Sequence, residues 1–85
     1  MNCLAILNSG NYSYSLCRYF EKKGHVFEVV NMPCQIAKTG CTYCLKYPEE
    51  FTPDVINAGK DNGTPVKEIY KVIPGVMKNK YEKIF

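Results

Sequence analysis

With 85 residues the chain is long enough for one small domain, and its share of hydrophobic residues, 46%, is ordinary for a globular protein. A formal net charge of +3 that is spread along the chain is too small to indicate a nucleic-acid-binding protein. The N-terminus has no basic segment before its short apolar run, and no stretch is apolar enough to span a membrane. We therefore expect a cytoplasmic protein with neither nucleic-acid nor membrane partners.

The first part of the chain predicts a strand followed by a helix. Residues 2–8 are a short apolar run that is typical of a buried strand. Ser9 or Asn11 can cap a helix that begins near Tyr12, and Gly24 is a typical residue at the end of a helix.

Two apolar side chains mark the buried face of this helix. Leu16 and Phe20 lie four residues apart, so we expect them to anchor the helix on a sheet. Residues 25–31 are rich in β-branched and aromatic side chains and predict a second strand, which Pro33 ends. Residues 32–40 then form a loop.

The second half repeats the order of strand, helix and strand. Residues 41–47 alternate between two faces, with Tyr43, Leu45 and Tyr47 on one and Thr42, Cys44 and Lys46 on the other. Thr52 and Pro53 predict a helix start as cap and first-turn residue, and residues 61–63 end that helix. Residues 66–73 predict the last strand.

This order predicts an α+β fold of the ferredoxin-like βαββαβ type. We expect a four-stranded antiparallel sheet in the order 4-1-3-2, with strand one central and two helices on one face. The other face would be open to a partner or to a second copy in a homodimer. Residues 1–75 would form this single domain, and residues 76–85 would be a tail that is mobile or forms a short helix.

Three of the five cysteines, Cys34, Cys41 and Cys44, lie in one segment, MPCQIAKTGCTYCLKYPEE (residues 32–50). An odd number of cysteines in a reducing compartment disfavours a disulfide framework. Cys41 and Cys44 form a CxxC pair, which can close only if Cys41 still belongs to the loop, because residues three apart in a strand are too far apart. A metal site built on Cys34, Cys41 and Cys44 would need a fourth ligand, which Cys3, Cys17 or His25 would have to supply.

A single reactive thiol is the other interpretation of this segment. Cys41 follows Lys38, Thr39 and Gly40, and a nearby ammonium group favours the thiolate over the thiol. A thiolate in a loop can attack an electrophilic sulfur or hold a persulfide without a metal. Cys41 as an ordinary small loop residue remains the alternative.

The cysteine segment resembles the signature of the small bacterial family DUF3343, whose members are described as selenium/sulfur carrier proteins. The matching residues are Pro33, Ile36, Cys41, Leu45, Lys46 and Tyr47 in the segment, with Ser9, Gly24, Ile69 and Tyr70 in the flanks. The resemblance covers about residues 1–73 and leaves the tail unmatched. The chain differs from the family pattern at Cys34, Thr42 and Cys44, where the family has a basic residue, a glycine and a small residue.

The resemblance implies a carrier, not a turnover catalyst, that holds sulfur or selenium on Cys41 as a persulfide or selenopersulfide. Lys38 would stabilise the thiolate, and Cys34 and Cys44 are candidates for resolving thiols, metal ligands or neutral substitutions. The partners would be donor and acceptor proteins, and no cofactor is implied. The alternative is a non-catalytic interaction module, such as a dimer, whose cysteine cluster binds a metal or is incidental.

Overall fold

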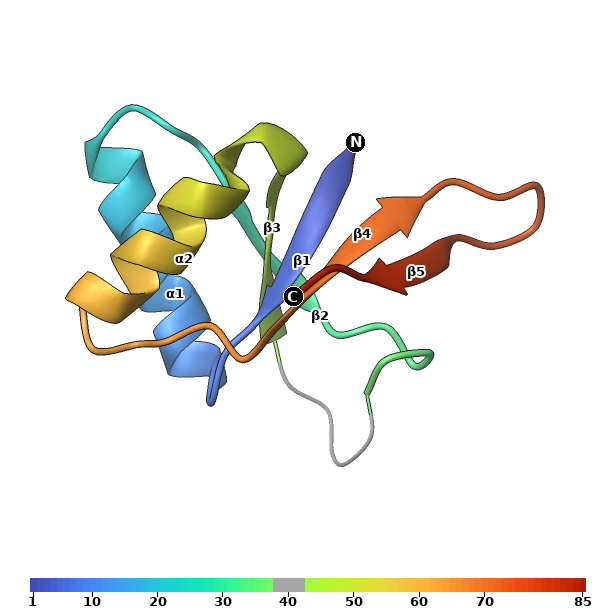
Figure 1. Cartoon of the computed structure of the whole chain (residues 1–85), viewed down its shortest axis with the longest axis horizontal. Helices are drawn as coiled ribbons and strands as arrows, with labels where there is room; N and C mark the ends of the chain where they lie inside the picture. The colour runs from blue at the N-terminus through green and yellow to red at the C-terminus, as the bar shows by residue number, and fades with distance from the viewer. Residues whose placement is uncertain (38–42) are drawn as a thin grey trace.

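The computed structural model describes residues 1–37 and 43–85, and in these ranges two α-helices pack against a sheet of five strands (Figure 1). The elements in chain order are β1 (Asn2–Ile6), α1 (Gly10–Lys22), β2 (Glu28–Asn31), β3 (Tyr43–Pro48), the 3-10 helix η1 (Glu49–Phe51), α2 (Thr52–Asp61), β4 (Glu68–Ile73) and β5 (Lys80–Lys83). The expected α+β class is therefore confirmed.

The strands lie in the order β2-β3-β1-β4-β5, and every neighbouring pair is antiparallel. The predicted order of the first four strands is confirmed, as is the central position of β1 between β3 and β4. A strand that is covered on both faces reads as a nearly continuous apolar run instead of an alternating one. This explains why residues 3–7 are all buried.

Helix α1 begins and ends at residues that the sequence marks. Ser9 has an extended backbone, with φ −151° and ψ 161°, and its side chain accepts a hydrogen bond of 3.3 Å from the amide of Tyr12. Ser9, and not Asn11, is thus the cap. Gly24 follows the helix with φ +91°, a conformation that favours glycine.

Helix α2 begins differently from the expectation. Thr52 is its first residue and Phe51 is the cap residue, while Pro53 lies in the first turn as expected. The Thr52 hydroxyl donates a hydrogen bond of 2.7 Å to the carbonyl of Glu49. The prediction that Thr52 caps the helix was therefore wrong. The 3-10 helix η1 directly precedes α2, and the Thr52 hydroxyl bonds to a carbonyl of η1 and not to an amide of α2.

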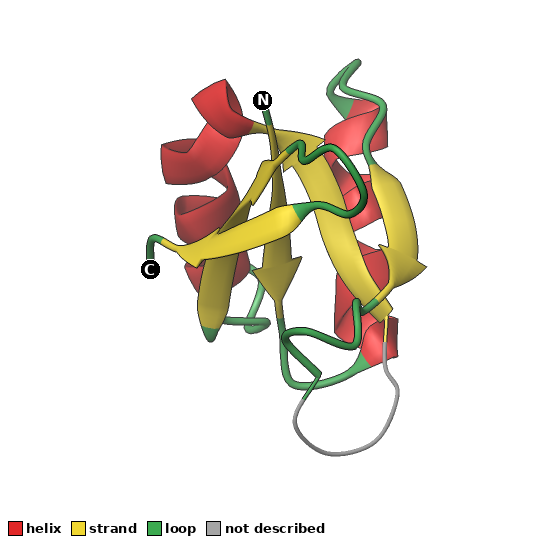
Figure 2. Cartoon of the chain, turned by 90° about the vertical axis from the view of Figure 1, so that its right-hand side faces the viewer, coloured by secondary structure: helices red, strands yellow, loops and turns green. Residues whose placement is uncertain are grey.

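Both helices cover the same face of the sheet, as predicted (Figures 1 and 2). Leu16 and Phe20 of α1 are buried there, and the Phe20 ring lies 4.7 Å from that of Phe27, between ring centroids. From α2, Val55 and Ala58 complete this first core cluster. Neither helix of the described ranges has the length and apolar character needed to cross a membrane.

The opposite face of the sheet is not open, and in this respect the prediction was wrong. Ile36, in the segment that follows β2, is buried on this face with Leu4, Ile6, Cys44 and Tyr70. Residues packed around this second cluster are Val30, Met32, Val72 and Tyr81. Because the pattern of the strands says nothing about where a connecting segment lies, the sequence did not reveal this cover.

The fifth strand is a further correction. Residues 76–85 were expected to be a helical or mobile tail, but Lys80–Lys83 pair with β4 as β5, in a register that sets Tyr81 opposite Val72. Pro74 and Gly75 do not end the sheet; they begin a tight turn, in which a Cβ on Gly75 would overlap the carbonyl oxygen of Lys78. The sequence KYEK did not predict a strand, because three of its four residues are charged and exposed and only Tyr81 is half-buried.

Candidate functional site

The described part of the cysteine segment is a turn that follows β2. The carbonyl of Pro33 accepts hydrogen bonds from the amides of Ile36 and Ala37, at 3.1 and 3.0 Å. The turn directs Ile36 into the second core cluster and leaves Cys34 exposed. Cys34 is therefore a surface thiol held on a defined turn.

The two residues that the sequence singles out most strongly, Cys41 and Lys38, lie outside the described residues. The same is true of Thr42, the position at which the family has a glycine. The chain becomes described again at Tyr43, the first residue of β3. The surroundings of Tyr43 are therefore the part of the site that the structure defines on the C-terminal side of residues 38–42.

Tyr43 contacts the first turn of α1. Its carbonyl accepts a hydrogen bond of 3.4 Å from the hydroxyl of Ser13, a fully buried residue. Its ring lies so close to Gly10 that a Cβ there would be 3.1 Å from the Tyr43 Cδ2 atom. The Tyr14 ring meets it edge to face, with 5.9 Å between centroids. The start of β3 is thus fixed against the N-terminal turn of α1.

This end of α1 favours negative charge. The first N–H groups of a helix and its macrodipole together place a partial positive charge at the N-terminus. The first turn of α1 carries no acidic side chain that would neutralise this charge. A thiolate near Gly10 or Tyr43 would therefore be stabilised relative to the thiol.

Cys44 lies on the opposite side of β3 from the helices. It is fully buried in the second core cluster, and this burial raises the pKa of its thiol from 9.0 to about 11. At neutral pH Cys44 is a protonated core residue. The predicted alternation of β3 is confirmed, since Leu45 and Tyr47 pack in the helix-side cluster.

The remaining described cysteines are also protected. Cys3 is buried in β1, and its pKa is raised chiefly by burial and also by the nearby Glu49 carboxylate. Cys17 is half-buried, and its thiol donates a hydrogen bond of 3.3 Å to the carbonyl of Phe27. Burial, with a smaller effect of Glu21, raises the pKa of Cys17. All four described cysteines are free, and Cys34 is the exposed one.

Within residues 1–37 and 43–85, no three His, Cys, Asp or Glu side chains are grouped so that they could hold a metal ion. The proposed trio of Cys34, Cys41 and Cys44 includes a residue outside these ranges. Of its described members, Cys34 is exposed and Cys44 is enclosed in the core. The residues suggested as a fourth ligand, Cys3, Cys17 and His25, lie in no such group either.

The sequence did not reveal that Ser13 and Tyr43 join α1 to the start of β3. Ser13 lies three residues before Leu16, on the buried face of the helix. A serine at a core position needs a hydrogen-bond partner, and this was the available signal. The sequence could not identify the partner as a main-chain carbonyl 30 residues away.

One comparison with known proteins finds a relationship. The family described as "Putative Se/S carrier protein-like" matches residues 2–71, from β1 into β4, so that the match takes in the complete cysteine segment. No curated protein and no solved structure matches the chain. The matched range is most of the 85 residues. The chain therefore belongs to the Se/S carrier protein-like family, as its cysteine segment led us to expect.

Proposed function

We propose that this protein carries sulfur or selenium on Cys41, between a donor protein and an acceptor protein. The observation that carries the proposal is the family match across residues 2–71, which includes the segment from Pro33 to Tyr47. The carrier would hold its cargo and pass it on without a turnover reaction of its own.

The contacts of Tyr43 support this choice of thiol. Cys41 precedes Tyr43 by two residues, a span of at most about 7 Å in an extended chain. The first turn of α1 packs against Tyr43. On our proposal the thiol of Cys41 would therefore have this helix N-terminus within reach. The partial positive charge there would lower the thiol pKa, and Lys38 would add to the effect.

The chemistry requires no oxidant beyond the donor itself. The Cys41 thiolate attacks the outer sulfur of a donor persulfide, R–S–SH, and forms a new S–S bond while the bond within the donor breaks. The donor leaves as the thiolate R–S⁻, and Cys41 becomes the persulfide. A donor whose outer atom is selenium would give the selenopersulfide by the same exchange.

Release follows from the neighbouring thiol or from the acceptor. Cys34 is exposed on the turn of Pro33, so it is our candidate for a resolving thiol. Its thiolate would attack the inner sulfur of the Cys41 persulfide, expel hydrosulfide and form a Cys34–Cys41 disulfide, which a cellular thiol reductant would then reduce. Cys44 could act in this way only after β3 opens, because it is buried and protonated. We therefore propose Cys34 ahead of Cys44.

We also infer that the fold is a ferredoxin-like βαββαβ unit to which β5 has been added. The order β2-β3-β1-β4 with two helices on one face supports this assignment. The cysteine segment and the N-terminus of α1 would then lie at one end of the unit, and the β4–β5 hairpin would extend its edge.

The test is loading from a defined donor. The protein is incubated with glutathione persulfide, and its intact mass is measured without reductant. We expect a gain of about 32 Da for one sulfur atom, which Cys41→Ser abolishes and Cys34→Ser, as the matched control, retains. Cys34→Ser should also slow the loss of the added sulfur. A gain that survives in Cys41→Ser would contradict the proposal.

A further inference from the structure

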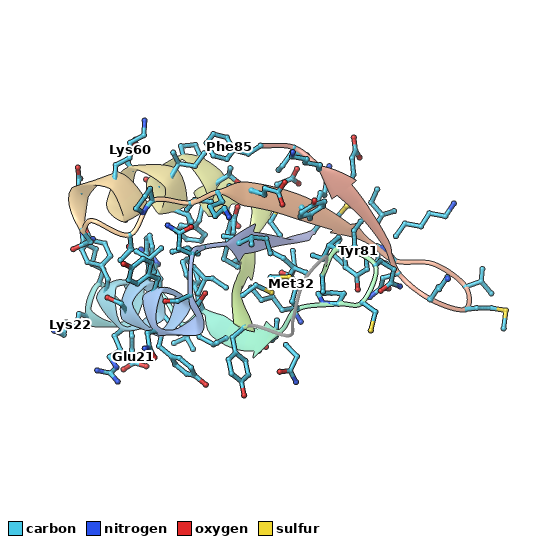
Figure 3. The ribbon with its side chains drawn as sticks, turned by 90° about the horizontal axis from the view of Figure 1, so that it is seen from below. Glu21, Lys22, Met32, Lys60, Tyr81 and Phe85 are labelled. Carbon is cyan, nitrogen blue, oxygen red and sulfur yellow. The ribbon has the colours of Figure 1, made fainter. Side chains whose placement is uncertain are left out.

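A groove lies between the turn of residues 33–37 and the β4–β5 hairpin. It has a volume of about 460 Å³. Its apolar lining comes from Ile36, Tyr70 and Tyr81, which belong to the second core cluster or pack against it. Figure 3 shows Tyr81 on the hairpin side of the molecule, with Lys22 and Lys60 far away at the helical end. The groove therefore lies well apart from the helices.

The rest of the lining is polar and basic. Gln35 and Asn79 supply side-chain amides, which can pair with a peptide backbone. Lys78 and Lys80 are exposed, and neither forms an ion pair with any carboxylate of the described ranges. The other lysines of the hairpin differ, because Lys71 pairs with Glu49 and Lys83 pairs with Glu68, each at 3.0 Å.

Beyond the groove, the tip of the hairpin presents two apolar residues. Val76 and Met77 are completely exposed, at 105% and 96% of their full surface. The hairpin projects beyond the body of the molecule (Figure 1). The turn before them needs glycine at position 75, because a Cβ there would overlap the carbonyl oxygen of Lys78.

From this combination we infer that the groove and the hairpin tip bind an acidic, extended segment of a partner protein. The carboxylates of the segment would pair with Lys78 and Lys80. An apolar side chain of the segment would enter the lining at Ile36 and Tyr81, and neighbouring apolar groups would cover Val76 and Met77. A few apolar anchors inside a polar rim are the usual arrangement of a protein interface.

The same surface fits a lipid membrane less well. Stable attachment to anionic lipid needs a large apolar area or a cluster of four or more basic residues. The hairpin tip offers two apolar side chains and two lysines that form no ion pair within the described ranges. Such a surface is sufficient for a peptide, which also uses the amides of Gln35 and Asn79.

This binding site goes beyond the carrier role and does not depend on it. The family match ends at residue 71, so Lys78, Lys80, Val76 and Met77 lie outside the family pattern. The groove nevertheless borders the turn that carries Cys34, so a bound partner would lie next to the cysteine segment.

The test uses a phage-displayed library of short random peptides, selected on the full-length protein. We expect the selected peptides to carry Asp and Glu around one apolar residue. Their affinity is measured by fluorescence anisotropy and should fall about tenfold or more in the double variant Lys78→Glu/Lys80→Glu. The reason is that two attractive pairs between a lysine and a carboxylate become repulsive. The matched control is Lys22→Glu/Lys60→Glu, which makes the same change of net charge at the helical end and should keep the affinity.

A second measurement locates the bound peptide. Amide chemical shifts should change at residues 35–36 and 78–81 and not along α1. The inference is overturned if the selected peptides are not acidic, or if both double variants lose affinity equally, since the attraction would then be one of net charge. It is also overturned if vesicles containing phosphatidylserine bind the protein while no peptide does. Loading of sulfur on Cys41 is measured separately, so failure here leaves the carrier proposal standing.

Discussion

At the scale of single residues, the cysteines differ in exposure and in acidity, and this difference predicts their order of alkylation. Under limiting iodoacetamide at neutral pH we expect Cys41 to react first and Cys34 second, with Cys3, Cys17 and Cys44 far behind because burial raises the pKa of each. Trypsin cuts after Lys38 and so separates Cys34 from the other two cysteines of the segment, which fragmentation then distinguishes.

The variant Lys38→Ala should slow the alkylation of Cys41 and leave that of Cys34 unchanged. Because this variant loses the tryptic site after residue 38, its three cysteines lie on one peptide, residues 24–46, and fragmentation distinguishes all of them. If Cys3 or Cys17 reacts before either loop cysteine, then both the fold and the carrier proposal are wrong. Protection of all loop cysteines until a chelator is added would instead favour the metal-binding alternative.

Cys44 also makes the stability of the protein depend on pH. Its folded pKa of about 11 exceeds the value of 9.0 for the unfolded chain, so the unfolded state releases its proton first as the pH rises. The stabilising effect of burying the neutral thiol is complete below about pH 9 and is lost as the pH rises through about 11. By about pH 10.5 the free energy of unfolding has fallen by about 2 kcal/mol from this cause.

We therefore expect urea unfolding to show Cys44→Ala less stable than the wild type at neutral pH, with the difference shrinking or reversing at about pH 10.5. Comparison with the wild type at each pH removes the effect of the other groups that ionise in this range. A difference that stays constant between the two pH values would show that the thiol is not desolvated in the folded protein.

At the scale of the elements, one hydrogen bond connects α1 to the start of β3. Ser13→Ala removes the hydroxyl that donates a hydrogen bond to the carbonyl of Tyr43. The substitution should lower the free energy of unfolding by about 1 kcal/mol, because the carbonyl loses this hydrogen-bond donor. The control is Ser15→Ala, which makes the same change at an exposed position of the same helix and so carries the same gain in helix propensity. Equal unfolding midpoints in urea for the two variants would count against the connection.

The packing of α1 on the sheet depends on Phe20. Its side chain is buried against Phe27, so Phe20→Ala should lower the free energy of unfolding by about 3–5 kcal/mol, a large part of the total for a domain of this size. Tyr12→Ala removes an exposed aromatic ring from the same helix and should have a small effect. A denaturant midpoint for Phe20→Ala that equals that of the wild type would contradict the position of the helix.

Elements with strong local signals could be predicted from the sequence. The apolar run of β1, the Ser9 cap with Gly24, and the alternation of β3 each follow from short-range patterns, and together they gave the order of the first four strands. The strand β5 and the cover of the second face could not be predicted. Both depend on contacts that form only after the chain has turned. For β5 the turn is the one at Gly75, and for the cover of the second face the contact is that of Ile36 with the sheet.

The candidate site was predicted in part and for the same reason. Its residue types and the family to which they belong could be read from the segment around Cys41, since a family signature is a local pattern. Two features are products of the tertiary structure: the burial of Cys44 and the contact of Ser13 with Tyr43. Neither could be read from spacing, because spacing places a side chain on a face and does not say what covers that face.

At the scale of the whole molecule, the chain has two regions with different relations to its family. Residues 2–71 match the Se/S carrier protein-like family and contain the cysteine segment with the helix that supports it. The hairpin of β4 and β5 extends past this range. It carries the exposed tip and supplies the two lysines of the groove, whose other side lies within the matched residues. In our account the first region holds the cargo and the second selects a partner.

The most direct test of the account is the state of Cys41 in protein isolated from its cells without reductant. The purified chain is digested with trypsin, and the peptide of residues 39–46 is examined by tandem mass spectrometry. We predict an addition of about 32 Da for sulfur, or about 80 Da for selenium, on Cys41, which a reductant removes. A Cys41 that is always found as the unmodified thiol, while another cysteine carries the addition, would contradict the account.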